Sequence, residues 1–417
     1  MIENISVLHI STADNLGGSG RSAYRIHTSL REAGVKSRML VGIKSMEDED
    51  VALIYNKERW RILDQVIGKC ADLFGLQYLF YPSSFKLQHH TWFKEADIVQ
   101  FYNTHGGYFS HLALPNISKR KPIVWRLSDM WPMTGHCAYS YDCERFKIGC
   151  GLCPYLSEYP SLKRDTTAFL WKIKNNIYKR SNINIVAPSK WIFDLAKQSP
   201  LINRFKISII PNGLNTQIFK PIKKEIAREL LNIDINKKVI FFSAHSIKDH
   251  RKGSIFLKEG ISRLSKKNMQ NIILLVNGSQ CGNCLKNYGF PVKYVNFTNN
   301  DTMMAVMYSA ADLFVLPTLA DNLPNGIIES MACGTPVVSF NVGGIPEAIA
   351  HMETGYVAKY KNSDDLAAGI EDLLENDDLR NKMSINCREL VEKKYSMELQ
   401  ASRYQDLYKK LLNEQNS

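Results

Sequence analysis

The chain has 417 residues, of which 45% are hydrophobic and 23% are charged, so it can bury a substantial core and is neither a disordered nor a fibrous protein. Its 53 Lys and Arg residues outnumber its 41 Asp and Glu residues, which gives a formal net charge of +12. This excess favours anionic partners such as nucleic acid, an acidic membrane surface or a phosphorylated substrate.

The first residues of the chain, 1–11, have neither the basic region nor the apolar core of a signal peptide, and they predict a strand. The most apolar helix-like stretch, 60–81, is interrupted by charges at Arg61 and Asp64. It therefore predicts a buried helix, with a membrane contact as the alternative, and no run is long enough to span a bilayer. We expect a cytoplasmic protein whose thiols stay reduced.

Short apolar runs alternate with amphipathic stretches along the chain, which predicts βαβ units and parallel sheets. These strands are too many for one sheet of usual size, so we expect two doubly wound domains that meet in the turn-rich segment 211–221. The predicted strands are 6–10, 37–41, 98–101, 123–127, 183–187, 206–210, 239–243, 272–276, 292–295, 313–316, 337–340 and 355–357.

The expected organisation is an N-terminal Rossmann-like domain over 1–218 and a second one over 219–396. The amphipathic stretch 397–417 predicts a C-terminal helix that crosses back to the first domain.

A glycine-rich loop follows the first predicted strand and leads into a helix. Gly17, Gly18 and Ser19 stand where backbone N–H groups and a helix N-terminus can face an anion, so they are a candidate phosphate or acceptor loop. The loop does not directly follow the strand, and 38–42 has no carboxylate for a ribose. A dinucleotide-binding function is therefore disfavoured.

The most informative segment is 311–338. A strand ends at Leu316, a polar loop carries Asp321, and the next helix is predicted to begin near Gly326 or Ile327, with Glu329 in its first turn. Both carboxylates are expected at the carboxyl edge of a parallel sheet, where open α/β sheets bind ligands. An alternative interpretation is a helix start that merely favours acidic residues.

This segment resembles the Glu-x7-Glu motif of the retaining, two-Rossmann-domain (GT-B) glycosyltransferases of family GT4, also called glycosyltransferase group 1. The resemblance extends from about residue 7 to 410 and implies the GT-B fold, with the two domains facing a cleft. Other matching stretches are Gly17-Gly18, 187–190, 211–213, 251–253, 331–338, 343–347 and 354–356.

By this resemblance, Glu329 holds the donor ribose and Asp321 lies near the donor sugar hydroxyls, although the family usually has Glu at the latter position. Lys252 matches the lysine that neutralises the donor diphosphate. Arg251 is the candidate for the second cation, because the family's usual arginine is Ser246 here. The resemblance also implies that Leu323, Pro324 and Asn325 line the sugar and diphosphate.

In the first domain, the family commonly has a His-Asp pair after a strand, and this chain has Ser128-Asp129 there. Asp129 therefore remains a candidate catalytic group, as does Asp321 in the second domain. His105 follows another predicted strand and is either a ligand-facing catalytic residue or a structural one.

A cysteine-rich loop, 136–154, carries Cys137, Cys143, Cys150 and Cys153. In a reducing compartment, four thiols so closely spaced suggest a structural zinc site, with free thiols and disulfides as the alternatives. A further pair, Cys281 and Cys284, is assigned no metal.

The leading hypothesis is a hexosyltransferase (EC 2.4 class) that moves a sugar, with retention, from a UDP- or GDP-sugar to a saccharide acceptor and needs no catalytic cofactor. The family context favours capsule, O-antigen or exopolysaccharide synthesis. It also favours a lipid-linked acceptor, with the protein peripheral at the anionic inner face of the membrane. The alternatives are a sugar-nucleotide epimerase of the same architecture, an inactive scaffold and a zinc-loop nucleic-acid-binding protein. No recognisable nucleic-acid-binding module supports the last of these.

Overall fold

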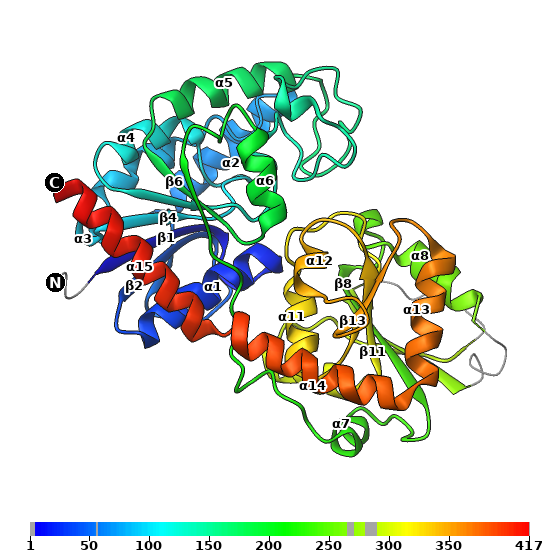
Figure 1. Ribbon diagram of the computed structural model, residues 1–417. Helices are drawn as coiled ribbons and strands as arrows, with labels where there is room; N and C mark the ends of the chain where they lie inside the picture. Colours follow the sequence, from blue (N-terminus) through cyan, green and yellow to red (C-terminus); the bar gives the residue numbers. More distant parts are fainter. Residues whose placement is uncertain (1–4, 56, 265–270, 280–289, 417) are drawn as a thin grey trace. The chain divides into compact units, whose positions relative to one another are not determined.

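The computed structural model describes residues 5–55, 57–264, 271–279 and 290–416. The chain forms two compact units, one of residues 1–213 with 398–417 and the other of residues 214–397 (Figure 1). The pair Cys281 and Cys284 lies outside the described residues.

In the first unit, the described residues form a seven-stranded sheet of order β3-β2-β1-β4-β5-β6-β7, in which every pairing is parallel. All of its strands therefore point their carboxyl ends toward one edge. The strands are β1 (Ser6–Ala13), β2 (Lys36–Ile43), β3 (Val51–Leu53), β4 (Ile98–Phe101), β5 (Ile123–Arg126), β6 (Ile183–Ala187) and β7 (Lys206–Ile209).

Helices cover both faces of this sheet because its strands are apolar on both sides. On one face, Ile26 of α1 and Tyr404 and Tyr408 of α15 share a core with Val7 and Val124. Figure 1 shows α15, in red, running along this unit. The other face is covered from α3 to α6. The helices are α1 (Gly17–Glu32), α2 (Glu58–Leu73), α3 (Thr91–Glu95), α4 (Leu114–Ser118), α5 (Thr167–Lys179), α6 (Lys190–Gln198) and α15 (Met397–Asn416).

The second unit repeats this design with a described sheet of order β10-β9-β8-β11-β12-β13, again parallel at every pairing. Its strands are β8 (Lys238–Ser246), β9 (Ile272–Ser279), β10 (Val292–Val295), β11 (Leu313–Leu316), β12 (Val337–Phe340) and β13 (Gly355–Ala358). Its helices are α7 (Lys224–Leu230), α8 (Ser254–Ser262), α10 (Asp301–Ala310), α11 (Asn325–Ala332), α12 (Ile345–Ala348), α13 (Ser363–Glu375) and α14 (Asp377–Lys394).

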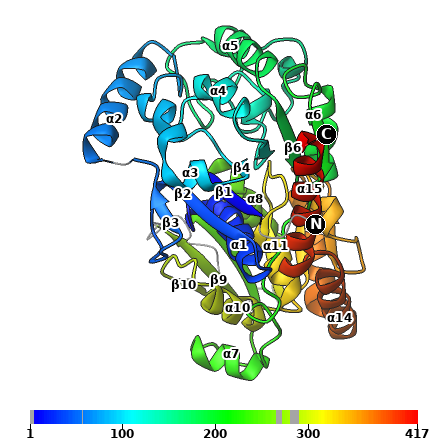
Figure 2. The same ribbon diagram turned by 90° about the vertical axis from the view of Figure 1, so that its left-hand side faces the viewer.

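The expectation of two parallel α/β domains is confirmed, and three details differ from it. Strand β3 is absent from the predicted strands. Helix α11 begins at Asn325, so Glu329 lies in its second turn. The stretch predicted as a buried helix forms α2, of which only Asp64, Gly68 and Ala71 are buried. Figure 2 shows α2 at the margin of the first unit. None of the helices among the described residues has the length and apolarity to cross a membrane.

Candidate functional site

Three of the predicted residues meet at the carboxyl edge of the second sheet. Arg251 and Lys252 lie in the 3-10 turn η5 (His250–Lys252) after β8, and Asp321 lies in the loop after the neighbouring strand β11. Lys252 Nζ lies 2.8 Å and Arg251 Nη1 lies 3.1 Å from Asp321 Oδ2. The side chains of Lys252 and Asp321 are 20% and 14% exposed, so the cluster is recessed but open to a ligand.

The cluster holds the two cations Arg251 and Lys252 beside Asp321, and Arg251 Nη2 also lies 3.5 Å from Asp249 Oδ2. Burial alone would raise the pKa of Asp321, but Lys252 and Arg251 outweigh it and hold that pKa below its usual range. Asp321 therefore stays ionised and fixes both cations, and two neighbouring cations at this edge of the sheet suit an anionic ligand.

The backbone around this cluster is tightly packed. Arg251 O accepts hydrogen bonds from Leu319 N at 2.7 Å and from Thr318 Oγ1 at 2.9 Å, which ties η5 to the loop after β11. Gly343 has a φ of +62°, and a Cβ there would lie 1.7 Å from Asp321 O. Any side chain at Gly343 would therefore displace Asp321.

Glu329 is buried on α11, where its Oε2 accepts a hydrogen bond from Tyr308 Oη at 3.2 Å. Leu323 and Pro324 are buried as well, and Leu323 packs into the core of the second unit. Asn325 is half-buried at the first position of α11. Leu323 thus has a packing role that the sequence analysis did not assign to it.

In the first unit, His105 and Asp129 come together although they follow different strands. His105 follows β4 and Asp129 follows the adjacent β5, and His105 Nε2 lies 2.9 Å from Asp129 Oδ2. Asp129 Oδ1 also accepts a hydrogen bond from Trp131 N at 2.9 Å. The structure therefore builds a His-Asp pair even though Ser128 stands at the family's histidine position.

Both ring nitrogens of His105 have a polar partner. A carboxylate can only accept, so Nε2 donates to Asp129, and Nδ1 lies 3.3 Å from Tyr159 Oη. Lys174 holds Trp131, the residue whose N–H binds Asp129. Its Nζ donates to Trp131 O at 2.7 Å and lies 3.3 Å from the centre of the Trp131 ring. Burial lowers the pKa of Lys174 to about 7.

The glycine loop lies beside this pair at the same edge of the sheet. Helix α1 begins at Gly17, and Ser19 Oγ lies 2.8 Å from Ser128 Oγ. Arg126, buried at the end of β5, donates from Nη1 to Ser128 Oγ at 3.1 Å. Arg126 was not predicted as a site residue, and its signal in the sequence is a charge at the end of an apolar strand.

Asp14, also missed, fixes the position of the glycine loop. This carboxylate is fully buried and accepts hydrogen bonds from the N–H groups of Asn15, Ser45 and Met46 at 2.7–2.8 Å. It therefore joins the segment before α1 to the segment after β2. An acidic residue directly after a first strand was the available signal.

The zinc prediction is not supported by the structure. Cys137, Cys143, Cys150 and Cys153 line one small cavity together with His136, and all four thiols are free. Yet in the described part of the chain no group of three or more His, Cys, Asp or Glu side chains is arranged to hold a metal ion. Burial raises the pKa of Cys137 to about 12 and that of Cys150 to about 11.

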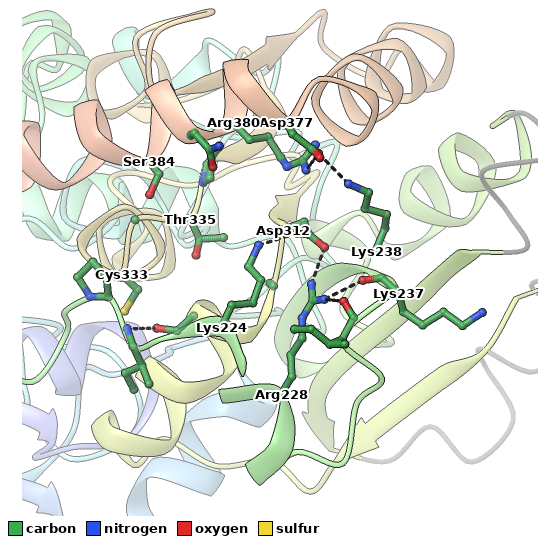
Figure 3. A pocket seen from close by; sticks show the side chains of 18 of the residues that line it. Lys224, Arg228, Lys237, Lys238, Asp312, Cys333, Thr335, Asp377, Arg380 and Ser384 are labelled. Carbon is green, nitrogen blue, oxygen red and sulfur yellow. Dashed lines mark hydrogen bonds and ion pairs between the residues drawn. The ribbon is translucent and has the colours of Figure 1, made fainter. Parts of the chain in front are cut away.

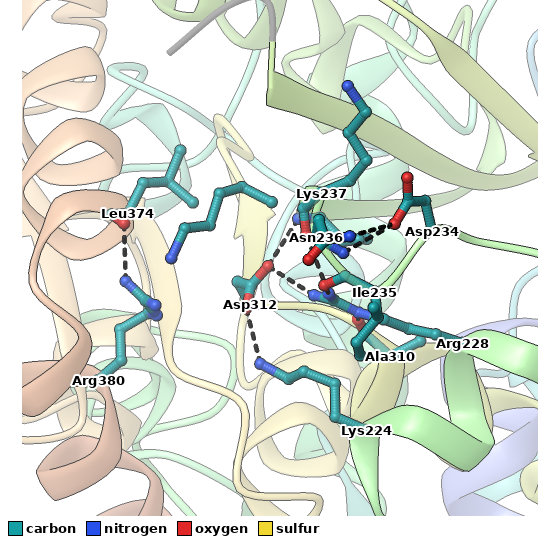
Figure 4. A network of polar contacts seen from close by, with 12 residues as sticks. Lys224, Arg228, Asp234, Ile235, Asn236, Lys237, Ala310, Asp312, Leu374 and Arg380 are labelled. Carbon is teal, nitrogen blue, oxygen red and sulfur yellow. Dashed lines mark hydrogen bonds and ion pairs between the residues drawn. The ribbon is translucent and has the colours of Figure 1, made fainter. Parts of the chain in front are cut away.

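A cavity of about 420 Å³ lies at the opposite, amino-terminal edge of the second sheet and contains none of the predicted site residues (Figure 3). At its wall, Asp312 is held by Lys224 Nζ at 2.6 Å and Arg228 Nη2 at 2.8 Å (Figure 4). Asp312 Oδ2 also accepts from Val239 N at 2.7 Å, so this network joins the starts of β8 and β11. We therefore assign it a structural role.

Comparison with known proteins follows the same division of the chain. Residues 223–390 match the family model described as "Glycosyl transferases group 1", and residues 16–218 match "Glycosyltransferase Family 4". The putative colanic acid biosynthesis glycosyl transferase WcaC of Escherichia coli is 24% identical over 268 residues, which are 61% of this chain and 58% of that protein.

A second relative, from Campylobacter jejuni, is named N,N'-diacetylbacillosaminyl-diphospho-undecaprenol alpha-1,3-N-acetylgalactosaminyltransferase. It is 29% identical over 213 residues, which are 50% of this chain and 55% of that protein. The chain thus spans little more than half the length of these curated relatives. The structure of Anabaena Alr3699/HepE in complex with UDP is similar in fold, with a TM-score of 0.66 and 15% identity over 97% of this chain and 100% of that one.

Proposed function

The chain belongs to the group 1, family 4 glycosyltransferases of the GT-B fold, and on this premise we propose that it transfers a sugar from a nucleotide-sugar to a saccharide acceptor. The observation that carries the proposal is the cluster of Arg251, Lys252 and Asp321. Its two cations lie at the carboxyl edge of the second sheet, where a diphosphate leaving group would be stabilised.

In the proposed donor complex, Lys252 and Arg251 face the diphosphate, and Asp321 holds both cations while accepting from a sugar hydroxyl. Glu329 holds the ribose, and the backbone from Leu323 to Asn325 lines the sugar and diphosphate. That the similar HepE structure contains UDP supports a nucleotide donor. Because the protein's own cations neutralise the leaving group, the proposed reaction uses no catalytic cofactor.

The proposed chemistry is transfer with retention. The acceptor oxygen forms a bond to the anomeric carbon on the face from which the diphosphate leaves. The bond between the anomeric carbon and the diphosphate oxygen breaks. The proton of the acceptor hydroxyl passes to a phosphate oxygen of the leaving group. Asp129 accepts from a second hydroxyl of the acceptor saccharide and so positions it, and His105 orients Asp129 through their 2.9 Å contact. The N-terminus of α1, with Gly17, Gly18 and Ser19, faces a phosphate group.

We place the acceptor among lipid-linked saccharides of surface-polysaccharide synthesis, with the protein on the anionic cytoplasmic face of the membrane. Two relatives support this class. The name of the relative from C. jejuni includes diphospho-undecaprenol, and the relative from E. coli is named for colanic acid biosynthesis. The net charge of +12 suits both a phosphorylated acceptor and an anionic surface.

The test is a panel of UDP- and GDP-sugars, with release of the free nucleotide measured with and without undecaprenyl-diphosphate-linked saccharides. We expect release from one donor to depend on an acceptor, and the product to keep the anomeric configuration of the donor. Turnover without any acceptor would favour an epimerase or a hydrolase. Absence of both nucleotide binding and turnover would contradict the proposal.

A further inference from the structure

Helix α2 leaves several large apolar side chains exposed to solvent, while it buries the carboxylate of Asp64. Of its residues, only Asp64, Gly68 and Ala71 are buried. Ile62, Val66 and Leu73 are 53%, 55% and 54% exposed. A surface helix normally buries its apolar stripe, so α2 has the opposite orientation.

Specific contacts fix this orientation. Asp64 accepts hydrogen bonds from the N–H of Ser83, at 3.2 Å, and from the Ser83 hydroxyl. Gly68 faces Tyr81, because a Cβ at Gly68 would lie 2.6 Å from Tyr81 Oη. Turning α2 to bury its apolar side would break the contacts of Asp64 and remove the close approach at Gly68. The fold therefore holds α2 with these apolar side chains facing outward.

The exposed apolar residues lie on one side of the helix. Ile62, Val66 and Leu73 are spaced by four and seven residues, which brings them to the same side. Phe74, which is 63% exposed, extends the stripe at the helix end. We call Ile62, Val66, Leu73 and Phe74 the α2 face. Phe85, 42% exposed, lies in the 3-10 turn η1 (Pro82–His89), which packs against α2.

Basic side chains surround the α2 face. Arg59 and Lys69 are exposed on the same side of the helix, and Lys86 Nζ lies 3.6 Å from the centre of the Trp60 ring. Exposed Arg61 is paired with Glu58 Oε1 through its Nε at 2.9 Å, so it adds little net charge. An apolar stripe with a cationic border is suited to the headgroup region of an anionic bilayer.

We propose that the α2 face is a membrane-docking surface that inserts into the headgroup–acyl boundary of an anionic lipid bilayer. A second copy of the chain is the less suitable occupant, because a symmetric contact through this face would bring Arg59 and Lys69 near their own counterparts. In an anionic bilayer, the apolar side chains can contact the acyl chains and the cationic side chains can contact the headgroups. At the margin of the first unit, α2 is placed for such a contact (Figure 2).

This inference deepens the proposed function, because it rests on the proposed membrane partner and names the residues that meet it. It does not depend on sugar transfer. A protein that binds vesicles through the α2 face but transfers no sugar would contradict the proposed function alone, and an active enzyme without vesicle binding would contradict this inference alone.

The experiment is co-sedimentation of the full chain with vesicles of phosphatidylcholine containing phosphatidylglycerol, compared with vesicles of phosphatidylcholine alone. We expect binding to the anionic vesicles that weakens as salt is added. Val66→Glu and Leu73→Glu should each weaken it roughly tenfold, because a buried apolar contact is replaced by a charge. Arg59→Gln and Lys69→Gln should each weaken it about fivefold.

The matched control is Ile385→Glu on α14, where an apolar side chain is 62% exposed on the other unit. It should bind vesicles like the unchanged protein, and all variants should keep the same affinity for UDP or GDP. Equal loss of binding in Ile385→Glu, or no binding to anionic vesicles by the unchanged protein, would overturn the inference. A dimer in solution that Val66→Glu converts to a monomer would overturn it too, in favour of a second copy.

Discussion

His105 and Asp129 illustrate how a side chain from one strand end can take a place that the family fills from another. The two residues follow the adjacent strands β4 and β5, whose parallel pairing brings their carboxyl ends together. Both ring nitrogens of His105 are engaged, with Asp129 and with Tyr159. We therefore propose that His105 positions Asp129.

His105→Ala is expected to lower the rate of transfer about 100-fold, because Asp129 loses the group that orients it. His105→Gln should recover part of the rate, since its amide can donate a hydrogen bond to Asp129. The affinity for UDP or GDP should not change, because the proposed nucleotide site lies in the other unit. Steady-state kinetics with nucleotide titration measure all three quantities.

The control for this prediction is His89→Ala, which alters an exposed histidine of the same unit. Equal rates in His105→Ala and the unchanged enzyme would show that Asp129 needs no orientation by His105. A loss of nucleotide affinity would instead indicate that the two units are coupled.

The sequence predicted which residues gather at the edges of the sheets but not how they pair. Lys252 and Asp321 were assigned separate partners on a donor, whereas the structure has them in contact at 2.8 Å. Such contacts depend on loop backbones, here the bond from Leu319 N to Arg251 O and the close approach at Gly343. Glu329 was recognised by its motif, but its burial beneath Tyr308 had no local signal.

At the scale of elements, a polar network joins β1, β2 and α1 inside the first unit. Ser37 Oγ lies 2.9 Å from His9 Nε2 and 2.7 Å from His27 Nδ1, and all three residues are buried. Burial lowers the pKa of His27 to about 4, although nearby Asp48 opposes the shift. Burial and the neighbouring His27 lower the pKa of His9 as well.

The network should make the first unit sensitive to acid. The pKa of His27 is lower in the folded than in the unfolded chain, so its contribution to stability is complete above about pH 6.5 and is lost as the pH falls toward 4. For His27 alone the loss approaches about 3 kcal/mol. Thermal unfolding between pH 7.5 and 4.5 measures it.

His27→Gln is expected to be less stable at pH 7.5 but to lose less stability on acidification, because one of the titrating groups is gone. His89→Gln serves as the exposed control and should retain the full acid dependence. If His27→Gln and the unchanged protein showed the same pH dependence, the network would not be the source of acid sensitivity.

Most strands could be predicted from the sequence because buried parallel strands are short apolar runs between turns. Strand β3 was not predicted because it has only three residues and follows an acidic segment. In that segment, the carboxylate of Asp48 lies 3.1 Å from Arg31 Nη1. Helix α2 was predicted to be buried because apolar content alone does not reveal which side of a helix faces the core. The pairing of Asp64 with Ser83 and the close approach of Gly68 to Tyr81 show which side it is.

At the scale of the whole molecule, the chain contains two sheets of the same kind with different chemistry at their carboxyl edges. The first carries a His-Asp pair and a glycine loop, and the second carries two cations on one carboxylate. We propose that the first unit serves the acceptor and the second the donor. In this proposal, the excess basic residues have two anionic partners, a diphosphate at Lys252 and an anionic bilayer at the α2 face.

The central claim is that the cluster in the second unit binds the donor diphosphate, and nucleotide affinity tests it most directly. Titration calorimetry with UDP and GDP should compare the unchanged protein with Lys252→Met and with Lys238→Met. Lys238 is a matched control, because its Nζ lies 2.8 Å from Asp377 at the opposite edge of the same sheet. We predict that Lys252→Met weakens binding about 10- to 100-fold, and that Lys238→Met leaves it unchanged. Equal affinity in the two variants would contradict the account.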